Sequence, residues 1–197
     1  MKKSLIAVCL SVCLVLGIST ASMAEGDFTG NLNLIGGGKF LDSGDWEPLE
    51  TQTEGGVEFD IKKQEWPVSF SMAFLYSSAD DTISVWWLPV EVEGKTTELR
   101  FGVRKIWEES SMIRPFLGGG LAIISAEIEG RSPWTWTKVS ESDTGPGAYL
   151  EGGLYWTLAD HLNLGFEVGY SYATVTFGDE DGNAGGLHAG LLAGYHW

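Results

Sequence analysis

The chain has 197 residues, with 12 basic and 27 acidic side chains, a formal net charge of −15 and 12% aromatic residues. This acidic balance argues against nucleic-acid binding, which depends on basic patches. Nine tryptophans, nine phenylalanines and six tyrosines argue against intrinsic disorder. Once a leader is set aside, the length fits one domain.

The first 24 residues have the pattern of a secretory signal peptide. Two lysines precede an apolar run from Leu5 to Ile18, and Ser22-Met23-Ala24 supplies small residues before a cleavage site. The run is shorter than the roughly 20 residues of a membrane-spanning helix. Both cysteines fall inside this segment, so cleavage leaves a chain without thiols. We predict a signal peptide over residues 1–24 and one exported domain over 25–197.

Beyond the leader, the chain repeats segments in which apolar and polar residues alternate with a period of two. Polar, glycine-rich or acidic stretches separate these segments, a pattern typical of successive β-strands. The predicted strands are Phe28–Phe40, Thr51–Lys62, Trp66–Tyr76, Thr96–Trp107, Ile113–Ile128, Gly147–Leu158, Leu162–Thr176 and Gly185–Trp197.

The connections between these strands alternate between short and long. The short ones are Lys63–Glu65, Glu108–Met112 and Ala159–His161, and the long acidic ones are Leu41–Glu50, Ser77–Lys95, Glu129–Pro146 and Phe177–Ala184. Such sorting is expected of an up-and-down barrel that crosses a membrane. In the second long connection the alternation resumes, so we expect a projecting hairpin that turns near Glu93-Gly94-Lys95.

Aromatic residues indicate which strand face meets lipid. In each predicted strand, every second side chain points to the same face, and one of the two faces, here called one parity, is almost free of charge. The tryptophans of this face lie beside the short connections or at the chain end. Other aromatic residues of the same face lie near the long connections. Two aromatic rings around an aliphatic band match the two interfaces of a bilayer. A soluble β-sandwich is the alternative, but it gives no reason for this placement. The two rings are Trp66, Trp107, Trp156 and Trp197, and Phe74, Tyr76, Tyr170 and Tyr172.

The predicted fold is therefore an all-β, eight-stranded antiparallel up-and-down transmembrane β-barrel, with three short periplasmic turns and four longer extracellular loops. The mature sequence, and above all its tail GGLHAGLLAGYHW, resembles the small outer-membrane β-barrel proteins of the OmpA and OmpX type. The resemblance implies that the last strand is an assembly signal read by the barrel-insertion machinery. Its residues are Leu191, Ala193, Tyr195 and Trp197.

The polar parity carries charges of both signs, which would face the narrow lumen of an eight-stranded barrel. Ionised groups in such a lumen need partners, so we expect a compensating network that acts as a structural plug. The alternative is a gated ion path in which an arginine exchanges carboxylate partners. The network comprises Glu58, Asp60, Lys62, Glu98, Arg100, Arg104, Arg114, Glu151 and Glu167.

Three further features suggest chemistry less strongly. His188 points inward near the long loops, but no local motif pairs it with a serine nucleophile. The segment DEDGN offers Asp179, Asp181 and Asn183 as oxygen ligands without the later glutamate of a calcium loop, so an acidic hairpin tip is favoured. Loop tryptophans are expected either at the lipid interface or in a contact patch. They are Trp46, and the patch candidates Trp86, Trp87, Trp134 and Trp136.

The sequence thus predicts a non-enzymatic protein of the cell outer membrane, with an envelope-structural or surface-interaction role through its extracellular loops. A narrow porin-like channel and a lipid A-modifying enzyme are the alternatives. We expect no cofactor. The expected partners are outer-membrane lipid and lipopolysaccharide, the barrel-assembly machinery, and an extracellular partner that the sequence does not name.

Overall fold

Eight long antiparallel strands form a closed barrel in the computed structural model, which describes residues 28–85, 88–107, 112–131, 138–159, 161–178 and 180–197. A short helix and a short strand lie outside the barrel wall. The wall strands are β1 (Phe28–Phe40), β2 (Thr51–Lys63), β3 (Ser69–Val85), β4 (Leu88–Ile106), β5 (Ile113–Arg131), β6 (Lys138–Leu158), β7 (Leu162–Phe177) and β9 (Gly186–His196), and the additional elements are α2 (Ser43–Trp46) and β8 (Glu180–Asn183).

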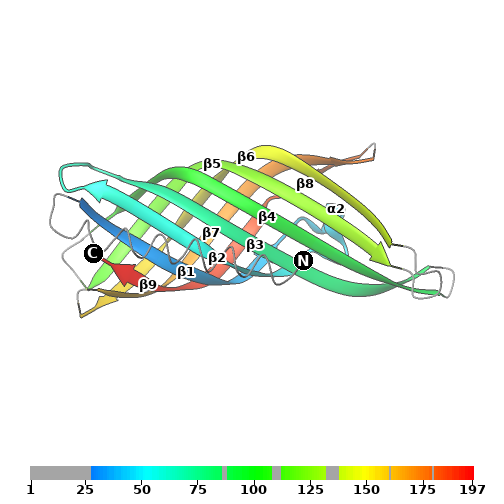
Figure 1. Ribbon diagram of the computed structural model, residues 1–197, viewed down its shortest axis with the longest axis horizontal. Coiled ribbons are helices and arrows are strands. Elements are labelled where there is room, and N and C mark those ends of the chain that lie inside the picture. Colours follow the sequence, from blue (N-terminus) through cyan, green and yellow to red (C-terminus); the bar gives the residue numbers. More distant parts are fainter. Residues whose placement is uncertain (1–27, 86–87, 108–111, 132–137, 160, 179) are drawn as a thin grey trace.

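The sheet closes because β9 pairs with both β1 and β7, and β6 also pairs with β7. Figure 1 shows the strands winding obliquely around the barrel, with the short turns at one end. At that end, Gly30 and Trp197 exchange two backbone hydrogen bonds of 3.0 and 3.1 Å. Closure gives wall strands a partner on both sides, as a β structure surrounded by lipid requires. The predicted eight-stranded up-and-down barrel is confirmed.

Side-chain alternation divides the wall into an apolar outer face and a polar lumen. Leu121 and Leu191, which point outward, expose 71% and 72% of their surface, whereas the inward Arg100 and Glu98 expose 0% and 1%. This is the reverse of a soluble protein, in which large apolar side chains are buried and charges are exposed. The outer face is therefore the surface that meets lipid.

Four strands, β3–β6, continue beyond the rest of the wall and form a projecting sheet (Figure 1). Pairing between β2 and β3 ends at Thr53 and Ser78, whereas β3 and β4 stay paired as far as Val85 and Leu88. Residues that the sequence assigned to long connections are therefore largely strand.

The predicted turn at Glu93-Gly94-Lys95 is wrong. Gly94 lies within β4 and pairs with Ala79 of β3. A Cβ atom on Gly94 would lie 3.1 Å from Leu49 Cδ1, so this glycine allows the segment after α2 to approach the strand closely. The glycine marks a packing contact and not a turn.

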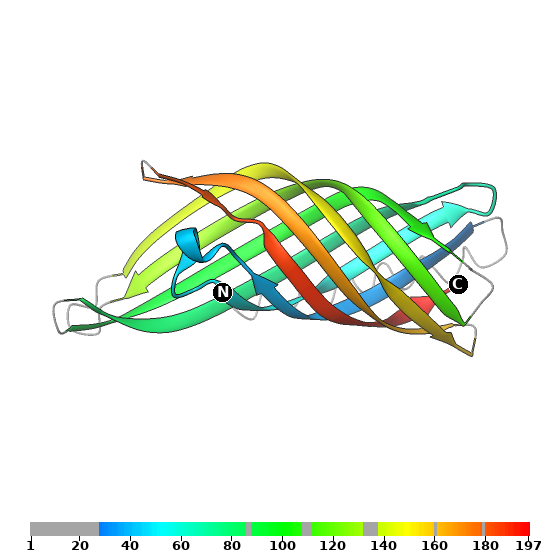
Figure 2. The same cartoon turned by 180° about the vertical axis from the view of Figure 1, so that it is seen from behind.

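An apolar cap closes the lumen at the projecting end. Trp46 of α2 is 3% exposed and packs with Leu41, Ile124 and Val175. Its Nε1 donates a 2.8 Å hydrogen bond to the carbonyl of Asn183. The expectation that Trp46 rests on lipid or joins a contact patch is thus wrong, because its ring fills the barrel mouth. Figure 2 shows α2, in blue, beside the beginning of β9.

Neither α2 nor β8 was expected from the sequence. Asp42 caps α2 by accepting a hydrogen bond from the Gly44 amide, and Asp45 Oδ2 accepts one of 2.9 Å from the Asn183 amide. In the described part of the chain, no helix is long and apolar enough to cross a membrane.

Carboxylates join the outer parts of β6 and β7, where their ladder has ended. Asp143 Oδ2 accepts a 2.7 Å hydrogen bond from the Thr176 amide, and Glu141 Oε1 accepts one of 2.6 Å from the Gly178 amide. The Thr176 and Thr144 amides hold the pKa of Asp143 below its usual value, since both hydrogen bonds favour the ionised carboxylate. These two hydrogen bonds connect the projecting sheet to the strands around the cap.

The contact between α2 and β8 predicts an engineered disulfide. A Cβ atom on Gly182 would lie 3.7 Å from the Asp45 Cβ, a separation that suits a disulfide bridge. In a chain with Cys9 and Cys13 replaced by serine, the Asp45→Cys/Gly182→Cys variant should form an intramolecular bridge on oxidation. Mass spectrometry after thiol alkylation measures it, with each single variant as the control. Two alkylated thiols after oxidation would contradict the docking of α2 on β8.

Candidate functional site

The lumen is the candidate functional site, because the polar parity of every wall strand points into it. Its side chains form three layers along the barrel axis, here called the turn layer, the arginine layer and the histidine layer. The turn layer is nearest the short turns, and the histidine layer lies beneath the apolar cap.

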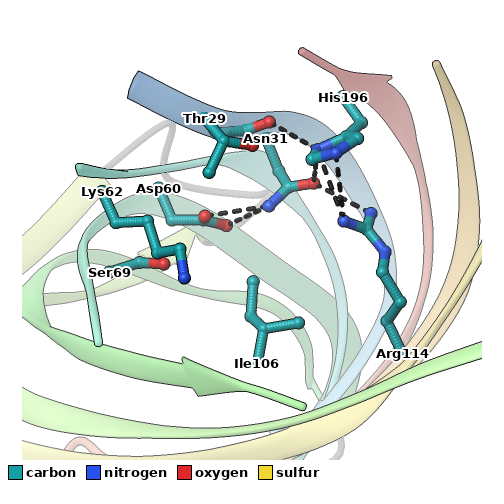
Figure 3. A pocket seen from close by; sticks show the side chains of 9 residues that line it. Thr29, Asn31, Asp60, Lys62, Ser69, Ile106, Arg114 and His196 are labelled. Carbon is teal, nitrogen blue, oxygen red and sulfur yellow. Dashed lines mark hydrogen bonds between the residues drawn. The ribbon is translucent and has the colours of Figure 1, made fainter. Parts of the chain in front are cut away.

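In the turn layer, Arg114 of β5 connects asparagines of β1 and β7, and His196 connects β9 with β1. Arg114 Nη2 donates to Asn163 Oδ1 at 2.7 Å. It also donates to Asn31 Oδ1 at 3.2 Å, and Asn31 Nδ2 donates to Asp60 Oδ1 at 2.9 Å (Figure 3). His196 Nδ1 lies 2.9 Å from the Gly30 carbonyl oxygen. The cavity between these side chains measures about 10 Å³, which is room for about one water molecule.

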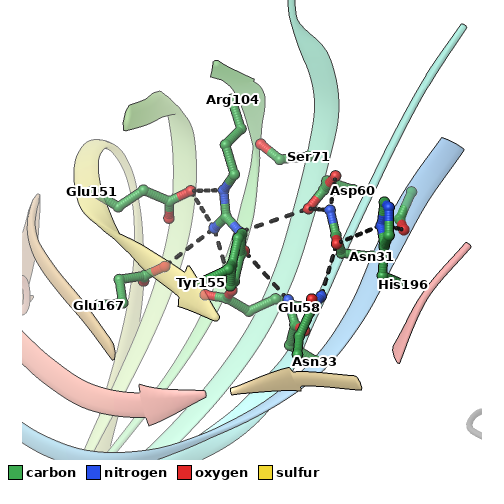
Figure 4. A network of polar contacts seen from close by, with 12 residues as sticks. Asn31, Asn33, Glu58, Asp60, Ser71, Arg104, Glu151, Tyr155, Glu167 and His196 are labelled. Carbon is green, nitrogen blue, oxygen red and sulfur yellow. Dashed lines mark hydrogen bonds and ion pairs between the residues drawn. The ribbon is translucent and has the colours of Figure 1, made fainter. Parts of the chain in front are cut away.

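Arg104 is the centre of the arginine layer (Figure 4). Its Nη2 lies 2.5 Å from Glu151 Oε1 and 3.2 Å from Glu167 Oε2, and its Nη1 lies 3.2 Å from Glu58 Oε2. Nη1 also donates a hydrogen bond to the Tyr155 hydroxyl. The guanidinium carbon lies 4.5 Å from the centre of the Phe116 ring, so one face contacts an aromatic while the edges bind carboxylates.

Arg100, four residues before Arg104 on the same face of β4, repeats this arrangement. Its Nε donates to Glu98 Oε1 at 2.7 Å, and its Nη1 lies 3.6 Å from Glu151 Oε2 and 3.8 Å from Glu167 Oε1. The guanidinium carbon lies 5.0 Å from the centre of the Tyr149 ring. Glu151 and Glu167 therefore contact both arginines and join the two groups into one network.

Three carboxylates of this layer have the grouping of a metal site. Ligand oxygens of Glu58, Glu151 and Glu167 all lie within 4.8 Å of one another. The Arg104 guanidinium contacts all three, so a side chain of the protein supplies the cation that the group requires. The charges of this layer are thus compensated within the protein.

In the histidine layer, His188 lies between Ser171 and Glu54, two residues that are distant from it in the sequence. His188 Nε2 is 2.9 Å from Ser171 Oγ, and His188 Nδ1 is 2.8 Å from Glu54 Oε2. Lys39 closes the layer, with its Nζ 3.4 Å from Glu98 Oε2 and 2.9 Å from the Ala184 carbonyl oxygen. All of these side chains are buried.

Serine, histidine and a carboxylate in this order resemble a nucleophilic triad, but the surroundings oppose acyl transfer. Ser171 Oγ also donates to Glu98 Oε2 at 3.1 Å, and this carboxylate would repel an oxyanion formed on a bound substrate. Ser171 is 0% exposed beneath the apolar cap. The sequence has no local His–Ser motif, yet His188 and Ser171 are in contact in the folded barrel. This contact lies in a closed interior.

The nine residues proposed for the lumenal network all lie in the lumen, and at least seven of them belong to one connected set of ion pairs. Lys62 and Arg114 line the small cavity of the turn layer together with Asp60, a member of that set. The connected seven are Glu58, Asp60, Glu98, Arg100, Arg104, Glu151 and Glu167. The network also includes lumen-facing residues that were not predicted, because Lys39, Glu54 and Ser171 lie on the polar faces of β1, β2 and β7.

The remaining predicted sites lie on the surface or outside the described residues. Leu191, Ala193 and Tyr195 lie on β9, with Leu191 and Tyr195 exposed on the lipid face, and Trp197 follows the strand. Asp181 Oδ1 accepts a hydrogen bond from Thr176 Oγ1, and Asn183 Oδ1 accepts from two backbone amides. The residues outside the described ranges are Trp86, Trp87, Trp134, Trp136, Asp179 and the predicted signal peptide.

The chain belongs to the outer membrane protein beta-barrel domain family, whose sequence profile matches residues 10–197. It is therefore an outer-membrane β-barrel protein, as its lipid-facing wall and polar lumen indicate. No curated protein sequence matches the chain.

Solved structures with the same fold include two outer-membrane proteins at low sequence identity. Ail, the attachment invasion locus protein of Yersinia pestis, in complex with the heparin analogue sucrose octasulfate, aligns with a TM-score of 0.56 at 13% identity, covering 87% of this chain and 100% of Ail. OprG from Pseudomonas aeruginosa aligns with a TM-score of 0.51 at 14% identity, covering 87% of this chain and 96% of OprG. These matches establish the shared fold.

The arginine layer predicts a large stability difference between two arginine substitutions. Arg104→Met leaves three carboxylates buried without their main cation and should lower the free energy of unfolding by about 3–5 kcal/mol. Arg131→Met, at the exposed end of β5, should change it by less than about 0.5 kcal/mol. Urea unfolding in lipid vesicles measures the free energy of unfolding of both variants. The folded fraction is read from the gel, because unheated folded barrel and heated unfolded chain migrate differently. Equal losses would contradict the plug.

Proposed function

We propose that this protein is a non-enzymatic surface-recognition protein of the outer membrane, and that its projecting sheet contacts partners outside the cell. The observation that carries the proposal is the free edge of this sheet. From Ala79 to Val85, β3 pairs with β4, and among the described strands it has no partner on its other side. An unpaired edge offers backbone donors and acceptors to an added strand.

Charge on this edge controls which contacts it can make. Asp80 and Asp81 are adjacent on β3, and repulsion between such edges in two copies of the chain opposes self-association. The edge is therefore suited to a partner of different composition. It also lies at the end of the molecule farthest from the short turns (Figure 1), which favours access from outside the cell.

The filled lumen supports recognition over ion conduction. An ion moving along the axis would meet the Arg104 and Arg100 pairs and then the cap that contains Trp46. Eight strands leave an interior just wide enough for side chains. We therefore expect no stable conductance in planar bilayers.

The sealed position of Ser171 supports a non-enzymatic role over lipid A modification. A nucleophile that acts on lipid must reach the acyl chains or headgroups, whereas Ser171 points into the lumen and is buried. Expression of the protein should therefore leave the mass of lipid A unchanged.

The complex of Ail with a heparin analogue does not suggest the same ligand for this chain. Sucrose octasulfate is a polyanion, whereas this chain carries a formal net charge of −15. Acidic residues also dominate the outer face of the projecting sheet, including Asp80, Glu91 and Glu93. The fold is shared, and the charge of the recognition surface favours a different partner.

The lipid-facing wall and the tail suggest the remaining partners. Outer-membrane lipid and lipopolysaccharide would surround the exposed apolar belt. The barrel-assembly machinery would read Leu191, Ala193, Tyr195 and Trp197, as the family resemblance implies. The extracellular partner would meet the projecting sheet.

Shortening the projecting hairpin tests this function. Replacing Asp81–Val92 with Asn-Gly joins Asp80 and Glu93, which are directly opposite in the register, and leaves the barrel wall intact. Cells displaying the intact chain should be retained on a coat of serum proteins or of matrix proteins, but not on heparin, whereas cells displaying the variant should be retained on none of these coats. A heat-dependent gel shift checks that the variant has assembled. Retention on no coat, or equal retention of both, would contradict the proposal.

A further inference from the structure

The strand register places acidic residues directly opposite one another on the outer face of the projecting sheet. Asp80 of β3 pairs with Glu93 of β4, and Glu93 pairs with Glu129 of β5. Like charges directly opposite on neighbouring strands destabilise a sheet. This three-carboxylate row therefore opposes folding, which is a feature more often found at functional sites than elsewhere.

One lysine compensates the row in part. Lys95 Nζ lies 3.0 Å from Glu93 Oε2 and 3.4 Å from Glu129 Oε2. Among the ion pairs of the described residues, none involves Asp80 or Glu91. The row and its neighbour therefore keep carboxylates that a cation from outside can bind.

The row lies in a groove that is large enough for a ligand. The groove has a volume of about 860 Å³, within the range of ligand sites. Five acidic and two basic residues line it, which leaves a formal balance of −3. The acidic residues are Asp80, Asp81, Glu91, Glu93 and Glu129, and the basic ones are Lys95 and Arg131.

We infer that this acidic groove binds an extended polycationic peptide segment of a partner. The inference rests on the proposed function and specifies the chemistry of the partner. Charge complementarity selects the ligand, because the outer face offers a carboxylate row, and the excess of carboxylates in the groove repels an anionic glycan or acidic peptide.

The spacing of the groove suits an extended peptide. Glu93 and Glu91 point to the same face of β4 and lie about 6.8 Å apart, since a strand rises about 3.4 Å per residue. Alternate side chains of an extended peptide have the same spacing. A segment with lysine or arginine at every second position would therefore place successive cations over the Glu93 row and over Glu91.

A peptide-binding experiment with charge-matched variants tests this inference. The probe is a fluorescein-labelled ten-residue peptide of alternating lysine and threonine, and fluorescence anisotropy measures its binding to the full chain in zwitterionic lipid nanodiscs. Asp80→Asn/Glu93→Gln removes two charges from the groove. Glu180→Gln/Asp181→Asn removes two charges from β8, which pairs with β7 and does not line the groove.

The groove variant should bind the peptide at least tenfold more weakly than the intact chain, and the β8 variant should bind within threefold of it. The groove variant relieves repulsion and should fold, which the heat-dependent gel shift checks. Equal weakening of both variants would show diffuse attraction and would overturn the inference, as would no binding by the intact chain. If cell retention still depends on the hairpin in that case, only the polycationic ligand is excluded and the recognition function stands.

Discussion

The pairing of every backbone polar group within a lipid-surrounded wall is the constraint on which the rest of the structure depends. An unpaired N–H or C=O group in the hydrocarbon of a bilayer costs several kcal/mol, so the sheet has to close. Here β9 closes it by pairing with β1 and β7, and Gly30 and Trp197 extend the closure to the short-turn end. Because lipid surrounds the closed wall, the apolar face of each strand points outward and the charged face points into the lumen.

Charged side chains in a narrow lumen then have to satisfy one another. Arg104 and Arg100 do so by sharing Glu151 and Glu167, and each guanidinium also packs against an aromatic ring. Outside the bilayer this constraint is relaxed, because water can solvate a strand edge. The projecting sheet can therefore keep an unpaired edge at β3 and an acidic outer face, the two features on which the proposed recognition rests.

The barrel wall was predictable from the sequence because a period of two in hydrophobicity is a local signal. The cap was not, since α2 and β8 have four residues each and are stabilised by distant contacts such as Trp46 with Asn183. Contact between His188 and Ser171 depends on the register of β7 and β9, which no local motif encodes. Gly94 was misread as a turn residue, because a glycine that permits close packing has the same local sequence signature as one that forms a turn.

The topology of the wall can be measured most directly with single cysteines in a chain whose Cys9 and Cys13 are replaced. The informative positions are Thr82 on the projecting sheet, Leu121 on the lipid face and Glu65 in a short turn. With a membrane-impermeant maleimide on intact cells, Thr82→Cys should react, Leu121→Cys should resist, and Glu65→Cys should react only after the outer membrane is permeabilised. Reaction of Glu65→Cys in intact cells, with protection of Thr82→Cys, would contradict the orientation on which the proposed function rests.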